Sequence, residues 1–149
     1  MARVETNTRR RTLRRCIISR DVEIHGVDAS LYVGAEGAGP ARLRRSMQHL
    51  EARGVLTEPL GGTIDALITI FAEPEPSAGR AEIPNVGSVL AVRPRLAAVV
   101  SLAPDEFGLL ATMMLAGRVA SAHLAFQEPK YGKGLVASFS FRTQPPEIG

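Results

Sequence analysis

The stretch of sequence that most constrains the fold is residues 101–143, where a helix pattern follows one strand pattern and precedes two others. Pro104 suits the first position of a helix, because the N–H group that proline lacks would have no partner there. Two carboxylates follow in the first turn, where they favour the positive end of the helix dipole. Gly117 suits the left-handed position that ends many helices. We therefore predict a helix over residues 104–116.

This predicted helix is apolar nearly all round, whereas a surface helix usually carries a single apolar stripe. One stripe consists of Phe107, Leu110 and Met114, and a second consists of Leu109, Met113 and Ala116. Either the helix is enclosed by its own domain, or a partner covers one stripe, for which methionines would give an adaptable surface. The candidate partner-binding residues are Phe107, Leu109, Met113, Met114 and, in a later loop, Tyr131.

Two strand patterns follow the helix. In 119–126 the even positions are apolar, and in 135–143 the odd positions are apolar, so each strand has one face for the core. An antiparallel pairing with Leu124 opposite Ala137 sets small residues opposite large ones, and a register slipped by two residues stays open. The connecting loop, 127–134, is longer than the commonest hairpin turn and is a candidate for binding.

The N-terminal part of the chain predicts a β-hairpin. Apolar and polar residues alternate over 14–24 and again over 27–33, with His25 and Gly26 between them as a two-residue turn. In this arrangement Arg20 falls opposite Leu31, which fits the apolar face poorly.

A glycine-rich segment, 34–39, follows this hairpin and leads into a predicted helix over 40–53. The segment is either a plain linker or a loop that binds an anion at a helix start. In the helix, Leu43, Met47 and Leu50 form a narrow apolar stripe, and the glycine after it provides the stop. Three more strand patterns lie at 64–71, 86–92 and 96–102.

Together these elements predict an α+β fold, with a mostly antiparallel sheet of about seven strands and two helices, at about 40–53 and 104–116. A single domain would span residues 13–143, with a Pro-rich surface loop at 73–85. A basic, flexible arm (1–12) would precede it and a tail (144–149) would follow it. The chain has 149 residues, of which 45% are apolar and 22% charged, so it can bury a core without disulfide or metal support.

The sequence also bears on the compartment. No apolar run is long enough to cross a bilayer, and no apolar signal-peptide stretch follows the basic N-terminus. Cys16 is the only cysteine, so an internal disulfide is excluded. We therefore expect a cytoplasmic protein with no membrane partner.

The positive charge is concentrated at the N-terminus. Because the whole chain carries +3 and its first 20 residues carry +6, from seven Arg against one Glu, the remainder carries −3. Arginine pairs well with phosphate, so such asymmetry favours contact with nucleic acid, although a solvated tail would look the same. The candidate nucleic-acid-binding residues are Arg9, Arg10, Arg11, Arg14, Arg15, Arg42, Arg44 and Arg45.

Residues 43–70 resemble the recognition helix and wing of a winged helix-turn-helix domain. The resemblance consists of the amphipathic segment from Leu43 to Arg53, then Gly54-Val55-Leu56, then Gly61-Gly62 and a strand. It implies a helix in the major groove and a wing on the phosphates. Upstream, where that family has helices, this chain has the predicted hairpin and the glycine-rich segment.

A second segment, Gly37-Ala38-Gly39 before the predicted helix, is similar to the acetyl-CoA pyrophosphate loop of the acetyltransferase superfamily. This resemblance implies a small acyltransferase-like enzyme. The chain departs from that pattern at Gly34, where the family has Arg or Gln, and at Pro40, where the family has a hydrogen-bonding N–H.

The side chains that could do chemistry do not assemble into a set. The histidines, His25, His49 and His123, have no metal-ligand spacing. His123 would face Ser138 on the polar side of the sheet, where such a pair is usually solvated rather than nucleophilic. We therefore expect no catalytic residue, no cofactor and no metal.

These observations favour a non-catalytic protein–protein interaction module, such as an adaptor, inhibitor or immunity-type protein, that acts through an apolar helix and sheet surface. Its partner would be another protein or a second copy of the chain, as in a homodimer. One alternative is a nucleic-acid-binding or transcription-regulatory protein that uses the Arg-rich N-terminus and the helix 40–53. The other is the acyltransferase-like enzyme.

Overall fold

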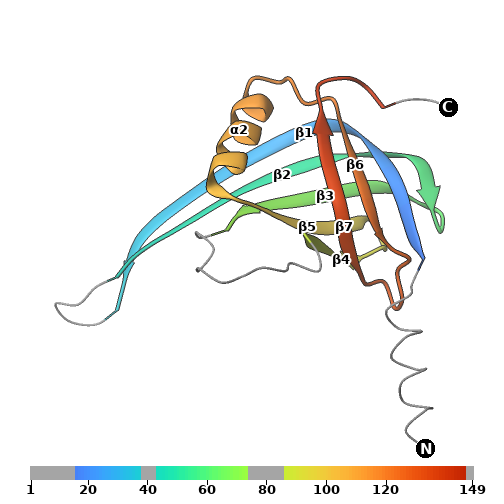
Figure 1. Cartoon of the computed structure of the whole chain (residues 1–149), viewed down its shortest axis with the longest axis horizontal. Helices are drawn as coiled ribbons and strands as arrows, with labels where there is room; N and C mark the ends of the chain where they lie inside the picture. Colours follow the sequence, from blue (N-terminus) through green and yellow to red (C-terminus); the bar gives the residue numbers. More distant parts are fainter. Residues whose placement is uncertain (1–15, 38–42, 74–85, 147–149) are drawn as a thin grey trace, which may run out of the picture.

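The computed structural model describes residues 16–37, 43–73 and 86–146, which form a closed seven-stranded β-barrel with a helix beside it (Figure 1). The strands are β1 (Ile17–Glu36), β2 (Leu43–Leu60), β3 (Thr63–Ala72), β4 (Gly87–Ala91), β5 (Leu96–Leu102), β6 (Ser121–Gln127) and β7 (Gly134–Arg142). Around the barrel they follow the order β1, β2, β3, β5, β4, β7 and β6, and β6 pairs with β1 to close the ring. Neighbouring strands are antiparallel, except that β3 and β5 are parallel.

The core is the interior of this barrel, because successive side chains of a strand point alternately inward and outward. In β3, alternation places Ile64, Ile68 and Ile70 on one face; Ile68 and Ile70 are fully buried, whereas Ile64 is 51% exposed near the start of the strand. In β6 the even positions are buried, as predicted. The largest fully buried side chains are Phe126, Leu50, Ile68, Ile70, Leu96, Leu124, Val22, Val89, Val100 and Val136.

The helix predicted over 104–116 is confirmed as α2 (Pro104–Leu115). At its start, the carboxylate of Glu106 accepts a hydrogen bond of 2.9 Å from the N–H of Ala103. At its end, Gly117 has a φ of +68°, and the N–H groups of Gly117 and Arg118 donate to the backbone oxygens of Met114 and Met113, in the pattern of a glycine-terminated helix.

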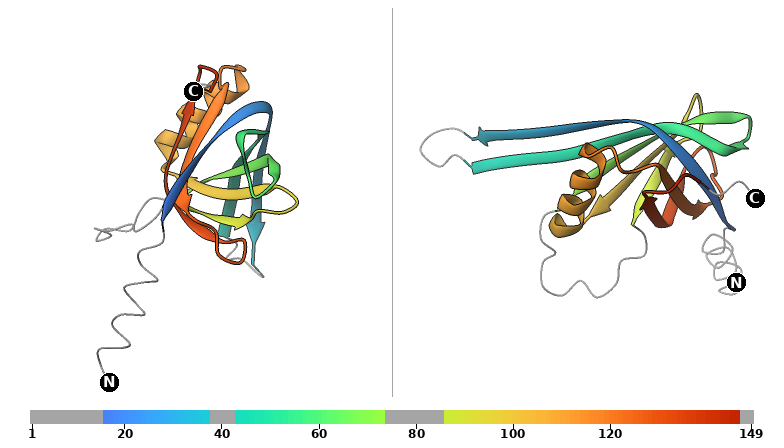
Figure 2. Two further views of the ribbon diagram at one scale, coloured as in Figure 1. Left: turned by 90° about the vertical axis from the view of Figure 1, so that its right-hand side faces the viewer. Right: turned by 90° about the horizontal axis from the view of Figure 1, so that it is seen from above.

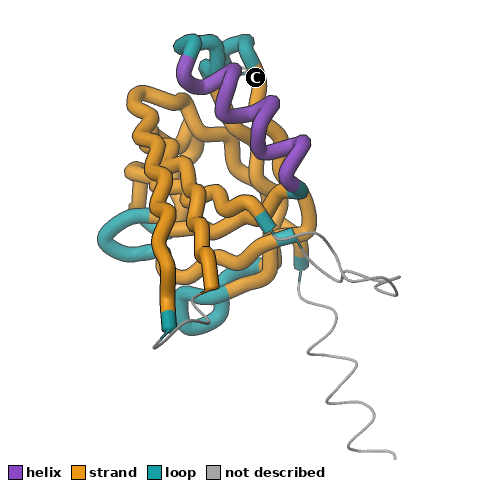
Figure 3. The backbone as a smooth tube through the Cα atoms, turned by 90° about the vertical axis from the view of Figure 1, so that its left-hand side faces the viewer, coloured by secondary structure: helices purple, strands orange, loops and turns teal. Residues whose placement is uncertain are grey.

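One apolar stripe of α2 completes the core. Phe107, Leu110 and Met114 are buried against the barrel, where α2 packs on β1, β3 and β5 (Figure 3). In the second stripe Leu109 is 66% exposed and Ala116 is exposed, whereas Met113 is half-buried against the core. The helix is therefore enclosed on one side only.

The predicted α+β fold with two helices and an open sheet is wrong. Among the described residues 68% lie in strands, the sheet closes on itself, and residues 43–53, expected in the first helix, belong to β2. Leu50, Ala52 and Leu56 are buried on the inner face, so a repeat of two residues overrides the helical stripe. Backbone pairing with β1 along the segment, and with β3 from His49 onward, stabilises the strand and outweighs helix propensity.

The predicted hairpin over residues 14–33 is also wrong, because β1 is one continuous strand through His25 and Gly26. Ile24 pairs with Gly54, and Gly26 pairs with Arg53, so His25 is an extra residue in a β-bulge. The bulge moves the inward positions from even to odd numbers. A two-residue turn and a bulge both change the apolar positions of the sequence from even to odd numbers. The sequence pattern alone therefore does not distinguish a hairpin from a continuous, bulged strand.

A second bulge changes the register of β6 and β7. Leu124 pairs with Phe139 rather than with Ala137, the slip of two residues that the sequence left open. Ala137 is the extra residue, because Ala125 pairs with Ser138 and Phe126 with Val136. Val136 therefore points inward and is fully buried, whereas the sequence predicts Leu135 in that role.

The distal parts of β1 and β2 extend beyond the barrel as a two-stranded ribbon, which we call the arm (residues 30–36 and 43–49). Ser30 pairs with His49 and Glu36 with Leu43, while β3 pairs with β2 only from His49 onward. The right-hand view of Figure 2 shows the ribbon projecting past α2. The basic N-terminal segment (1–12), a different part of the chain, lies outside the described residues, as does most of the Pro-rich loop (73–85).

Candidate functional site

A pocket opens at the end of the barrel away from α2. It has a volume of about 690 Å³ and is enclosed by the first residues of β1, the β2–β3 turn, the β4–β5 turn and the loop between β6 and β7. Its walls are mainly apolar and include Ile18, Leu60, Leu90, Val92 and Pro129. Charged side chains from three different segments join them, namely Arg20, Arg93 and Glu128.

Arg20 lies on the inner face of β1, because it pairs with Leu124 of β6, which is fully buried. Its Nη1 donates a 2.8 Å hydrogen bond to the backbone oxygen of Ser19, and its Nη2 makes a long contact of 3.5 Å with that of Pro59. Its Nε is buried and has no hydrogen-bond partner among the described residues. Arg20 therefore presents donors that the described part of the protein does not satisfy.

Two side-chain hydrogen bonds tie the turns that form one side of the pocket. The hydroxyl of the buried Thr63 donates to the backbone oxygen of Val92 at 2.9 Å. Nη2 of Arg93 donates to the backbone oxygen of Gly61 at 2.9 Å. These bonds join the β2–β3 turn to the β4–β5 turn, so this side of the rim is preorganised.

The opposite side of the rim carries Tyr131 at the tip of a tight turn. Lys130 and Lys133 exchange backbone hydrogen bonds of 2.9 and 3.1 Å, and Tyr131 and Gly132 have φ values of +55° and +78°. Positive φ at both central positions defines a turn that favours Asn-Gly, and tyrosine is strained in the first position. Tyr131 is also 93% exposed, so packing of its ring does not compensate this strain.

The arm is a second candidate site, because it exposes apolar side chains on both faces. Leu31 and Val33 are 66% and 48% exposed on the face that continues the inner side of the barrel. Tyr32 and Met47 are paired on the other face and are 52% and 44% exposed. Among the described residues, no strand pairs with the outer edge of β1 beyond Ile24, or with the outer edge of β2 before His49.

The structure does not bring the predicted partner-binding residues together. Phe107 and Met114 are buried in the core and cannot meet a partner, and Met113 is half-buried. Leu109 is exposed on α2, whereas Tyr131 lies at the far end of the barrel. The exposed residues Leu31 and Met47 of the arm were missed, because the sequence assigned the first to a hairpin core and the second to a helix.

The predicted nucleic-acid-binding residues are described only in part. Arg9, Arg10, Arg11, Arg14, Arg15 and Arg42 lie outside the described residues. Arg44 is exposed on β2, opposite Ala35, and Arg45 belongs to the same strand. The winged-helix interpretation of these residues fails, because the segment expected to enter the groove is a β-strand and Gly61-Gly62 form the β2–β3 turn.

The glycine-rich segment is also only partly described. Gly34 lies in β1 and Gly37 follows it, while residues 38 and 39 lie outside the described part. The next described element is a strand, so the helix that the acetyl-CoA pyrophosphate loop requires is replaced. This overturns the basis of the resemblance to acetyltransferases.

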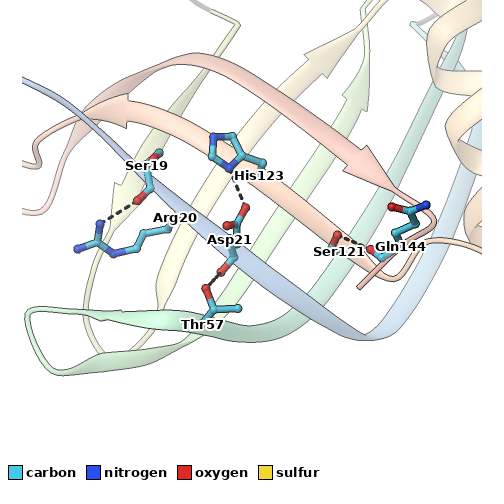
Figure 4. Close-up of polar contacts among 7 residues, drawn as sticks. All are labelled: Ser19, Arg20, Asp21, Thr57, Ser121, His123 and Gln144. Atoms are coloured by element: carbon cyan, nitrogen blue, oxygen red, sulfur yellow. Dashed lines mark hydrogen bonds and ion pairs between the residues drawn. The ribbon is translucent and has the colours of Figure 1, made fainter. Parts of the chain in front are cut away.

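His123 lies on the outer face of the barrel and not in the pocket. Its Nδ1 lies 2.7 Å from Oδ1 of Asp21 on the neighbouring strand, and both side chains are about one-third exposed, at 36% and 37% (Figure 4). In the observed register His123 pairs with Ser140 rather than with Ser138, and the described part of the chain gives it no hydrogen bond to either serine. Among the described residues, the His–Ser pair expected on this face is therefore not formed.

Arg53 of β2 forms an ion pair with Asp28 of β1, whereas the other two histidines lie at the edge of contact with a carboxylate. His25 lies 4.0 Å from Glu23, and His49 lies 3.9 Å from Glu51, all on exposed or half-exposed surface. Across residues 16–37, 43–73 and 86–146, no group of three or more His, Cys, Asp or Glu side chains could hold a metal ion. Over the same ranges, no helix is long and apolar enough to cross a membrane. Comparisons with protein-family models, with curated proteins and with solved structures found no match.

Proposed function

We propose that this protein is a non-catalytic interaction module, and that its arm binds a second copy of the chain by pairing strand with strand. The observation that carries the proposal is the arm itself. It exposes Leu31, Tyr32, Val33 and Met47, and both of its outer edges lack a pairing strand among the described residues.

A two-stranded ribbon with no third strand is only marginally stable in water. Its open edges present N–H and C=O groups that another strand can pair with, and its exposed apolar side chains favour burial. Proteins usually protect such edges with charges, proline or a short length, yet the arm segment of β1 carries one charged residue, Glu36, at its very end. These features support binding of a partner strand rather than permanent exposure to solvent.

The outer edge of β1 is self-complementary. If two copies meet antiparallel with Leu31 on the two-fold axis, the side chains of the two Leu31 residues face each other, and Ala29 faces the second copy's Val33. Asp28 then faces Gly34, and Glu36 faces Gly26, so no like charges are opposed. All of these residues belong to β1, so the interface needs no further element.

The test is the oligomeric state in solution, measured by light scattering over a concentration series. We expect a dimer, and Leu31→Lys should raise its dissociation constant about tenfold or more, because an apolar contact is replaced by two facing charges. Ile64→Lys is the matched control, because Ile64 is a similarly exposed apolar residue of the barrel at 51% exposure. A wild-type protein that stays monomeric at the highest concentration reached would overturn the proposal.

Cross-linking tests the register. With the exposed Cys16 replaced by serine, Leu31→Cys should form a disulfide-linked dimer under mild oxidation, because the two cysteines face each other across the axis. Ser30→Cys should not, because its expected neighbour is the second copy's Tyr32. Equal cross-linking of both variants would contradict this register.

Contact with nucleic acid through the Arg-rich N-terminus remains a second proposal. It is supported by the seven arginines among the first 20 residues and does not involve a recognition helix. A cytoplasmic location also remains a proposal, supported by the absence of a disulfide partner for Cys16.

A further inference from the structure

We propose that the pocket at the barrel end binds a small amphipathic molecule with an anionic carboxylate head, and that Arg20 is the counter-ion of this head. The site lies at the end of the barrel away from α2, does not use the arm, and is independent of the interaction proposed above.

The position of Arg20 is the first argument. Its neighbours on the inner face of β1 are Ile18 and Val22, and the residue opposite is Leu124, so a cation interrupts an apolar wall. Arginine is seldom turned toward the inside of a protein unless an acidic group pairs with it. Among the described residues, no Asp or Glu forms an ion pair with Arg20.

The unsatisfied donors of Arg20 are the second argument. Its shorter bond, to the backbone oxygen of Ser19, is made to the adjacent residue, and the Nε proton is directed at no described acceptor. A planar guanidinium offers paired donors that match the two oxygens of a carboxylate. An anionic head would therefore supply the acceptors that the pocket lacks.

The shape and lining of the pocket define the rest of the ligand. A volume of about 690 Å³ is typical of sites for small organic molecules. The apolar walls, with Leu60, Leu90 and Val92 among them, favour a hydrocarbon or aromatic body. Arg93 adds a second cation and Glu128 a single anion, so the charged residues of the lining favour a negative ligand.

Leu90 reaches the pocket because of a β-bulge. Val89 pairs with Ala98 and Ala91 with Ala97, so Leu90 is an extra residue in β4, and its side chain is 53% exposed at the pocket. Bulges commonly redirect a side chain toward a binding site. An exposed leucine in this position is explained by an apolar ligand that covers it.

Tyr131 combines local strain with exposure at the rim of the pocket. Its φ of +55° is unfavourable for tyrosine, and its ring is 93% exposed while it lines the pocket. Strained residues that packing does not explain are concentrated at binding sites. We infer that the ring of Tyr131 closes over the apolar body of the ligand.

The test uses three probes with the same chain and different heads: decanoate, decanol and decyltrimethylammonium. Binding is measured by isothermal titration calorimetry below the concentration at which each probe forms micelles. We expect decanoate to bind about tenfold or more tightly than decanol, because a charge-assisted hydrogen bond to Arg20 is lost with the alcohol. The cationic probe should bind least.

Arg20→Gln should remove this preference, so that decanoate and decanol bind alike. Arg95→Gln is the matched control, because Arg95 is exposed in the β4–β5 turn and is not part of the pocket lining. If Arg20→Gln does not fold, Leu90→Glu supplies the second variant, since an exposed carboxylate placed in the apolar wall should weaken decanoate binding.

Each outcome decides the proposal. The proposal is supported if the preference for decanoate is lost in Arg20→Gln and kept in Arg95→Gln. Where Arg20→Gln does not fold, it is supported if Leu90→Glu weakens decanoate binding and Arg95→Gln does not. Equal binding of decanoate and decanol, no binding of any probe, or an unchanged preference in Arg20→Gln overturns it.

Discussion

Gly54 of β2 packs directly against the backbone carbonyl of Glu23 in β1, so closely that a Cβ atom at this position would overlap it. This contact lies beside the bulge at His25, where β1 bends and the two strands approach each other. The glycine is therefore required by the close approach of two strands.

Gly54→Ala should destabilise the protein by about 2 kcal/mol or more, because the added methyl group overlaps backbone rather than a flexible side chain. Chemical denaturation monitored by circular dichroism measures the effect. Gly108→Ala is the matched control with the opposite sign. Gly108 lies inside α2 with open space around it, so alanine should stabilise the helix by about 0.5–1 kcal/mol. If Gly54→Ala and Gly108→Ala changed the free energy of unfolding in the same direction and by the same amount, the close approach of β1 and β2 at Gly54 would not be the cause of the effect.

Tyr131→Asn should stabilise the protein by about 1 kcal/mol, because asparagine followed by Gly132 is the preferred pair for a turn with positive φ at both positions. The same change should weaken decanoate binding, because the ring at the pocket rim is lost. Thermal unfolding and calorimetry on the same sample give both values. A variant that is more stable and binds equally well would leave Tyr131 without a role in the pocket.

The Asp21–His123 pair should contribute little to stability, because both side chains are more than one-third exposed. A double-mutant cycle with Asp21→Asn and His123→Gln should give a coupling free energy of about 1 kcal/mol or less near neutral pH. Coupling of several kcal/mol would show that this pair has a stronger structural role than its exposure suggests.

The N-terminal arginines should bind duplex DNA in a salt-dependent way if the second proposal is right. Affinity for a random-sequence duplex should fall steeply with salt, because phosphate contacts release counterions. Replacement of Arg9, Arg10, Arg11, Arg14 and Arg15 by glutamine should abolish it. A shallow salt dependence, or equal binding by the variant, would argue against contact through these residues.

The sequence predicted correctly those elements whose signals are local. The helix α2 begins at Pro104 and ends before Gly117 because both residues act on their own turn of the chain. β6 was also found, because alternation over a short strand involves no irregularity. Elements that depend on distant partners were predicted less well, and β2 is the clearest case. Its helix-forming residues become a strand because β1 pairs with them along their length and β3 pairs with them from His49 onward.

The bulges explain most of the remaining errors. At His25 and Ala137 one extra residue switches the inward positions between even and odd, and sequence periodicity alone reads this switch as a turn or as a different register. The pocket could have been found in part. Arg20 was visible as a charge on the apolar side of an alternating run, but only the closed barrel shows that this side is the interior.

The bulge at His25 also sets a rule for how the length of the arm can vary. The residues on either side of His25, Ile24 and Gly26, already pair with consecutive residues of β2, so deleting His25 would remove the bulge and leave Leu31 and Tyr32 on the faces that they have. Lengthening or shortening both strands of the ribbon together would leave the faces as they are. Natural variants of this chain should therefore tolerate paired insertions near the end of the arm and loss of the bulge residue itself, but another single-residue insertion or deletion near its base only where a new bulge takes up the difference.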